Sequence, residues 1–166
     1  MTQPREKENT SGKVHISNNI LCWDYRDKNI LRVHIDDVLV IGEYTNSSGP
    51  WFDDWFLTFV TKDGQWQSIP MYADNINQLF DILCTKFDPD LRENSLTGST
   101  SWDSAILYPI SLRGKKLFKL TPTETFKEPK TFFDKLLSSI GLGGHSTTRY
   151  VDLADEVKNE VTNACR

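Results

Sequence analysis

The chain has few cysteines and no long apolar run, and each absence excludes a class of protein. Its three cysteines, Cys22, Cys84 and Cys165, lie far apart and are odd in number. They match neither a disulfide framework nor a CxxC zinc site. No stretch approaches the roughly 20 apolar residues of a membrane span, and polar residues 1–12 lack the apolar core of a signal peptide. We therefore expect a cytoplasmic protein with no transmembrane segment and a disordered leader over residues 1–12.

An excess of basic residues is also missing, as are the common catalytic motifs. Aspartate and glutamate number 23 and lysine and arginine 19, for a formal net charge of −4. This balance gives no support for nucleic-acid binding. The three histidines show no HxH or HExxH spacing, and no serine lies in a GxSxG motif. The sequence therefore favours a non-enzymatic protein with no cofactor and no bound metal.

What is present begins with a series of predicted β-strands. Runs of β-forming residues occupy 14–17, 20–25, 30–35, 38–45, 55–61 and 65–72. In 30–35, Leu31, Val33 and Ile35 alternate with polar residues and should face the core. The dipeptide Asp63-Gly64 predicts a tight hairpin, because it supplies the positive φ angles that such a turn needs.

An amphipathic helix is predicted from Asp74 to Phe87. Its apolar residues recur with a helical period at Ile76, Leu79, Phe80, Leu83 and Phe87. Asp74 is the expected N-cap, and Pro89 lies just beyond the end. We expect this helix to pack on the strands through its apolar stripe.

The rest of the chain predicts a strand pair and two further helices. Residues 105–112 and 115–121 flank Arg113-Gly114 as a second hairpin, and residues 130–141 form an amphipathic helix. A last helix, with a narrow stripe of small apolar residues, lies within residues 146–166 and is either loosely docked or a partner-binding tail. The predicted fold is α+β: an antiparallel, strongly bent sheet or half-barrel, closed by a helix, in one domain over residues 13–145.

The element order resembles a known family. Short strands from Val14 to Tyr72 include the segment IGEYTNSSGPWFDDWFLTFVTKDGQWQSIP, and a helix follows. This order is similar to the bacterial pleckstrin-homology-like or GRAM-like half-barrel over about residues 13–88. The resemblance implies a barrel closed by a helix and a binding module. The additional strand pair and helix over 105–140 depart from the family plan.

Acidic residues are concentrated in one part of the chain. Residues 33–61 contain Asp36, Asp37, Glu43, Asp53 and Asp54, with no lysine or arginine. These carboxylates could be solvated or complement charges within the fold, could bind a basic protein, or could hold a metal or act as general acid and base. Trp51 and Phe52 precede Asp53 in a Ser-Ser-Gly-Pro loop. Exposed aromatics beside carboxylates are typical of a protein-binding hot spot, although both rings could instead cover the core.

Three functions follow from these patterns. The first is a protein-binding module of inhibitor or immunity type that covers a basic partner surface, using Trp51, Phe52, Asp53, Asp54, Asp36, Asp37 and Glu43. An alternative is an anionic-lipid or phosphate-binding module using Arg113, Lys115, Lys116 and Lys119. A third is a small metal-dependent enzyme that uses the paired aspartates.

Overall fold

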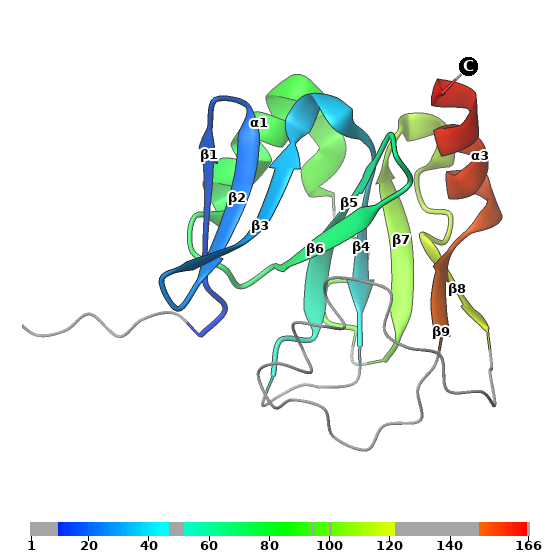
Figure 1. The fold of residues 1–166 in the computed structure, drawn as a ribbon. Coiled ribbons are helices and arrows are strands. Elements are labelled where there is room, and N and C mark those ends of the chain that lie inside the picture. The colour runs from blue at the N-terminus through cyan, green and yellow to red at the C-terminus, as the bar shows by residue number, and fades with distance from the viewer. Residues whose placement is uncertain (1–9, 47–51, 94, 100, 122–149, 166) are drawn as a thin grey trace, which may run out of the picture.

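The described residues form a mixed α+β fold of antiparallel sheets and helices (Figure 1). The computed structural model describes residues 10–46, 52–93, 95–99, 101–121 and 150–165. Trp51 and the predicted helix at 130–141 lie outside them. Among the described residues the sheets are not closed into a barrel.

The strands are arranged in three sheets. A three-stranded sheet contains β1 (Lys13–Ser17), β2 (Ile20–Tyr25) and β3 (Lys28–His34). The central sheet has the order β6-β5-β4-β7 and contains β4 (Val38–Thr45), β5 (Trp55–Thr61), β6 (Trp66–Pro70) and β7 (Asp103–Tyr108). A third sheet pairs β8 (Phe118–Thr121) with β9 (Tyr150–Leu153). The helices are α1 (Ile76–Lys86) and α3 (Asp155–Ala164), with short 3-10 turns at Ile35–Asp37, Pro89–Arg92 and Ile110–Leu112.

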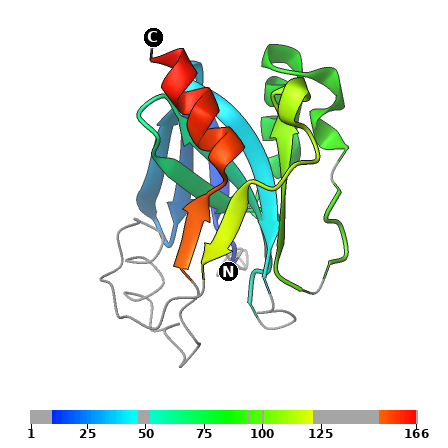
Figure 2. The same cartoon turned by 90° about the vertical axis from the view of Figure 1, so that its right-hand side faces the viewer.

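The central sheet is covered on both faces. On one side of β5, Trp55, Leu57 and Phe59 pack into a cluster shared with the β1-β2-β3 sheet and α1. On the other side, Phe56 and Val60 pack into a cluster shared with β8, β9 and α3. Figure 2 shows this second layer lying across the central sheet. Apolar residues are therefore needed at successive positions of β5, as in strands buried on both faces.

The hairpin at Asp63-Gly64 is confirmed, with a longer loop than predicted. The Thr61 N–H donates to the Gln65 carbonyl at 2.9 Å, and the Gly64 N–H donates to Thr61 at 2.8 Å. Gly64 has φ of +75°. The connection is thus a three-residue loop with glycine in the left-handed region, the next most common type after two-residue turns.

Helix α1 is confirmed, but its N-cap is not the one expected. Leu79, Phe80 and Leu83 are buried, and Ile76 and Phe87 pack against the same cluster. The N-cap is Asn75, not Asp74. The Asp74 backbone instead donates to the Gly12 carbonyl and accepts from the Val14 N–H, both at 2.9 Å.

The second hairpin was predicted with the wrong partners. β7 pairs with β4, and β8 pairs with β9. Between β7 and the following turn there remain two backbone hydrogen bonds, Ile106 N–H to Lys115 and Gly114 N–H to Ile106, both 2.8 Å. Pro109 has no N–H with which to extend a ladder, and the chain turns so that Leu117 and Phe118 cover the far face of the central sheet.

The C-terminal segment is a strand followed by a helix, whereas a helix alone was predicted. Residues 150–153 form β9 and the helix begins at Asp155. Leu153, Ala154 and Val157 are buried in the second cluster. Val151 and Leu153 alternate in β9, and Val157 and Val161 lie one turn apart in α3, so that together these positions resemble one long helical stripe.

Residues 11 and 12, at the end of the polar leader, are buried against β2. The Trp23 indole N–H donates to the Ser11 carbonyl at 3.0 Å, and Ser11 is 5% exposed. Gly12 has φ of +77°, and a Cβ there would lie 2.5 Å from both the Asp24 carbonyl oxygen and Trp23 Nε1. Only glycine fits this position without displacing β2.

The packing of α1 predicts a large loss of stability on truncation of Leu83. Leu83 is fully buried, so Leu83→Ala should lower the free energy of unfolding by roughly 2–5 kcal/mol. The adjacent Ile82 is 42% exposed, and Ile82→Ala should change it by only about 0.5 kcal/mol. Urea unfolding of both variants is the measurement, and equal losses would contradict the packing.

Gly12→Ala and Gly98→Ala should differ in cost. Gly98 has φ of +80° with nothing within 4 Å of a new Cβ, so its substitution should cost only the backbone term of about 1–2 kcal/mol. Gly12→Ala should cost a further 1–3 kcal/mol or so, because it also overpacks the contact with Trp23. Thermal unfolding should therefore show a lower Tm for Gly12→Ala, and similar Tm values would refute the close approach.

Candidate functional site

Phe52, Asp53 and Asp54 lie at the start of β5, as the sequence places them. Phe52 is 55% exposed, and the two aspartates are half-buried. The Ser11 hydroxyl donates to Asp53 Oδ1 at 2.7 Å. The Asn46 N–H donates to the Asp54 carbonyl at 2.8 Å, which ties the end of β4 to this segment.

Tyr72 joins these residues, and sequence reasoning missed it. Its hydroxyl donates to Asp54 Oδ1 at 2.8 Å, and its ring meets Trp55 edge to face with centroids 6.5 Å apart. Tyr72 is 50% exposed. The signal was available in the hairpin register: Trp55 accepts from the Met71 N–H, so the next residue lies beside Asp54. We call Phe52, Asp53, Asp54 and Tyr72 the aromatic–acidic patch.

The electrostatics of the patch are set by partial burial and by the two adjacent acids. Burial raises the pKa of Asp53, and the charge of Asp54 adds to the increase, whereas the Ser11 hydrogen bond opposes it. Burial and the bond to Asp54 raise the pKa of Tyr72 to about 12, so its hydroxyl stays a donor at neutral pH. Within the described part of the chain, neither aspartate forms an ion pair.

Asp36 and Asp37 lie at the other end of β5 and are both ion-paired. Asp36 pairs with Lys86 and accepts from the Asn19 amide. The Lys86 hydrogen bond lowers the pKa of Asp36. Asp37 pairs with Lys62 at 3.3 Å, just after β5 ends. The paired-carboxylate interpretation required all four aspartates to meet in one centre. The structure instead places the two pairs at opposite ends of β5.

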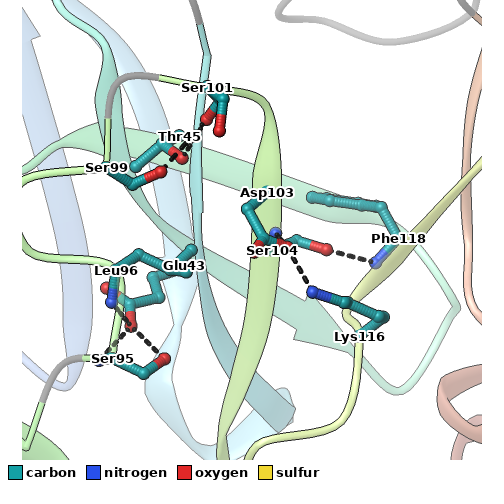
Figure 3. A network of polar contacts seen from close by, with 10 residues as sticks. All are labelled: Glu43, Thr45, Ser95, Leu96, Ser99, Ser101, Asp103, Ser104, Lys116 and Phe118. Carbon is teal, nitrogen blue, oxygen red and sulfur yellow. Dashed lines mark hydrogen bonds and ion pairs between the residues drawn. The ribbon is translucent and has the colours of Figure 1, made fainter.

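Glu43 was predicted to face a partner, but its side chain is fully buried. The Trp55 indole N–H donates to Oε2 at 2.8 Å, and the N–H groups of Ser95 and Leu96 donate to Oε1 at 2.7 and 3.1 Å. The Ser95 hydroxyl adds a bond of 3.1 Å. Figure 3 shows Glu43 projecting from β4 toward Ser95 and Leu96, with the contacts of Asp103 and Ser104 on the neighbouring strand β7. Glu43 thus attaches the segment at 95–96 to the central sheet and supports Trp55.

The basic residues of the alternative anion site are mostly engaged with acids of the fold. Arg113 donates to buried Asp88 at 2.6 Å, and Lys119 pairs with Asp155 at 2.6 Å. Lys116 pairs with Asp103. Lys115 is exposed in the turn before β8. A shallow groove joins these lysines to Asp155 and Glu156, so acids lie among the bases.

In the described ranges, no group of three or more histidine, cysteine, aspartate or glutamate side chains is placed to hold a metal ion. None of the described helices has the length and hydropathy needed to cross a membrane.

No protein-family model, curated protein or solved structure matches the chain.

The raised pKa of Asp53 predicts that Asp53→Asn stabilises the fold at neutral pH. The folded protein favours the protonated carboxyl of Asp53. The contribution of this carboxyl to the free energy of unfolding is therefore greatest below its ordinary pKa of 3.8 and is lost as pH rises through the raised pKa. Asparagine carries no charge and can still accept from Ser11. The gain in urea unfolding should therefore be present at pH 7 and shrink toward pH 4.

Asp63→Asn provides a control of opposite sign. The hydrogen bond from the Thr61 hydroxyl lowers the pKa of Asp63. The ionised carboxylate of Asp63 therefore stabilises the fold above its ordinary pKa, and this stabilisation is lost in acid. This variant should lose stability at pH 7. A loss at pH 7 for Asp53→Asn as well would contradict the assigned environment of Asp53.

Proposed function

We propose that the chain is a non-enzymatic, cytoplasmic protein-binding module and that the aromatic–acidic patch contacts a basic partner. The observation that carries the proposal is the combination of two exposed rings with two carboxylates that no described cation neutralises. Phe52 and Tyr72 offer apolar area at the centre, and Asp53 and Asp54 attract positive charge at the edge.

Half-burial of the carboxylates strengthens the argument for this location. Asp53 is held by Ser11 and Asp54 by Tyr72, so both are oriented before a partner arrives. A carboxylate that is already partly desolvated loses less hydration on binding, and fixed side chains lose less rotamer freedom. Asp36 and Asp37, in contrast, already have lysine partners in the fold.

The proposal also includes the role of the interaction and the kind of protein that is bound. An inhibitor or immunity-type role, in which the patch covers a basic site on another protein, fits an acidic chain of this size. The resemblance of residues 13–88 to pleckstrin-homology-like or GRAM-like domains, which rests on the order of the predicted strands and helix, also suggests a binding module. Trp51, next to the patch in sequence, belongs to the same hypothesis.

Phe52→Ala should reduce partner binding, whereas Ile110→Ala should not. Ile110 is 67% exposed and provides a matched exposed apolar residue elsewhere. Loss of an anchor at the centre of an interface costs about 2 kcal/mol or more, or roughly thirtyfold in Kd, mainly through faster dissociation. The measurement is quantitative capture from native cell extract with each variant, followed by binding kinetics on the proteins whose recovery differs.

Asp53 and Asp54 should increase the rate at which the partner associates. Replacing Asp53 and Asp54 together by Asn should slow association, with a deficit that shrinks as salt rises. Replacing Asp36 and Asp37 by Asn is the control and should leave the rate unchanged. If the same partners are recovered with all variants, or if only the control pair matters, the patch is not the contact surface.

A further inference from the structure

A groove separates the β1-β2-β3 sheet from the central sheet on the side of β3 and β6. It has a volume of about 440 Å³. Its lining comes from both strands and the turn beyond β5, and includes Arg32, His34, Lys62, Gln65, Trp66 and Gln67. β3 and β6 are the edge strands of their sheets and run toward each other in Figure 1. The groove is therefore bounded by two strand edges.

The hydrogen-bond pattern shows which backbone groups of β3 face this groove. In an antiparallel pair, opposed residues alternate between hydrogen-bonded and non-hydrogen-bonded positions. The Ile35 N–H donates to the Asn19 carbonyl at 3.0 Å, so that position is hydrogen-bonded. One residue along each strand from this position, Ile20 opposes His34, and three residues along, Cys22 opposes Arg32. Both are non-hydrogen-bonded, so the N–H groups of Arg32 and His34 point away from β2.

The same alternation applies to β6. The bonds from Thr61 to Gln65 and from Met71 to Trp55 mark hydrogen-bonded positions at both ends of the hairpin. Trp66 and Ser68, which oppose Val60 and Thr58, are then non-hydrogen-bonded and direct their backbone groups outward. Pro70 occupies the next outward position, where its missing N–H has no consequence for the ladder. In the described residues, no backbone hydrogen bond joins β3 to β6.

We propose that the groove between β3 and β6 binds an extended acidic segment of a partner protein by strand addition. Unpaired strand edges bind extended peptides through main-chain hydrogen bonds, and here a peptide would meet one edge on each side. The acidic character follows from Arg32, which lines the groove on β3. Lys62 is paired with Asp37, which also lines the groove. Asp63 lies at the turn end, where it accepts from Thr61 and Gln65 and keeps its negative charge, so a bound carboxylate would lie beside Arg32. Arg32 is exposed and has no polar side-chain contact within the described ranges, so it is the cation left to bind a carboxylate.

This groove is independent of the aromatic–acidic patch. The patch lies before β5 and after β6, whereas the groove lies at the turn end of the hairpin. The two surfaces also differ in chemistry, since the patch attracts a basic surface and the groove an acidic strand. Either of the two binding proposals could therefore be wrong without affecting the other.

The test uses the full chain, labelled with nitrogen-15, and an acetylated, amidated hexapeptide of alternating Glu and Val. We expect saturable shifts of the backbone amide signals of Arg32, His34, Trp66 and Ser68. The same peptide N-methylated at every valine lacks donors for one edge and should bind much more weakly. A Lys-Val hexapeptide controls for charge and should not bind.

Protein variants separate the groove from general charge effects. Arg32→Ala should raise the peptide Kd roughly two- to fivefold, the size of an exposed ion pair. Lys28→Ala removes an exposed cation of β3 that does not line the groove and should leave the Kd unchanged. Equal effects of the two variants, equal binding of the N-methylated peptide, or no shift at millimolar peptide would overturn the proposal. If protection of the same amides from hydrogen exchange rises with protein concentration in the absence of peptide, a second copy of the chain occupies the groove. That result would also overturn the proposal.

Discussion

The central sheet cannot exist uncovered, because its strands carry apolar side chains on both faces. Leu57 and Phe59 require the β1-β2-β3 sheet and α1, while Phe56 and Val60 require β8, β9 and α3. Burial of these faces is the main favourable contribution to folding that the structure shows. The positions of the other elements follow from it. Even Glu43, buried within this sheet, is tolerated because indole, hydroxyl and backbone donors surround its carboxylate.

Charges that are separated along the sequence meet in the fold. Acids of the 33–61 segment and of later loops find cations from α1 and from residues 113–119, as in Asp36 with Lys86 and Asp88 with Arg113. Of the five acids in the 33–61 segment, Asp36 and Asp37 are ion-paired, as the interpretation that the charges complement each other within the fold expects. Asp53 and Asp54 stand apart from this pattern, which is why the candidate site is smaller than the acidic set that suggested it.

Local features of the fold could be predicted from the sequence, and long-range pairing could not. The β1 to β6 strands and α1 follow from alternation, helical period and turn residues, all of which act over a few positions. The pairing of β8 with β9 joins residues far apart in the chain, and no local pattern specifies it. For the same reason the sequence suggested a hairpin at Arg113-Gly114, where β7 instead joins β4. At the site, Phe52 and its aspartates were found by composition. The burial of Glu43 depends on Ser95 and Leu96, whose backbone donors have no sequence signal.

The layer over the second face has a consequence for synthesis on the ribosome. β4 to β7 emerge before β9 and α3, so the face bearing Val40, Tyr44, Phe56 and Ile106 stays open to water until residues 150–164 leave the exit tunnel. A nascent chain in that state exposes a continuous apolar sheet surface, the kind that chaperones bind and that aggregates when released early. A premature stop codon before β9 would make this state permanent, so truncation there should yield an insoluble product rather than a smaller folded domain.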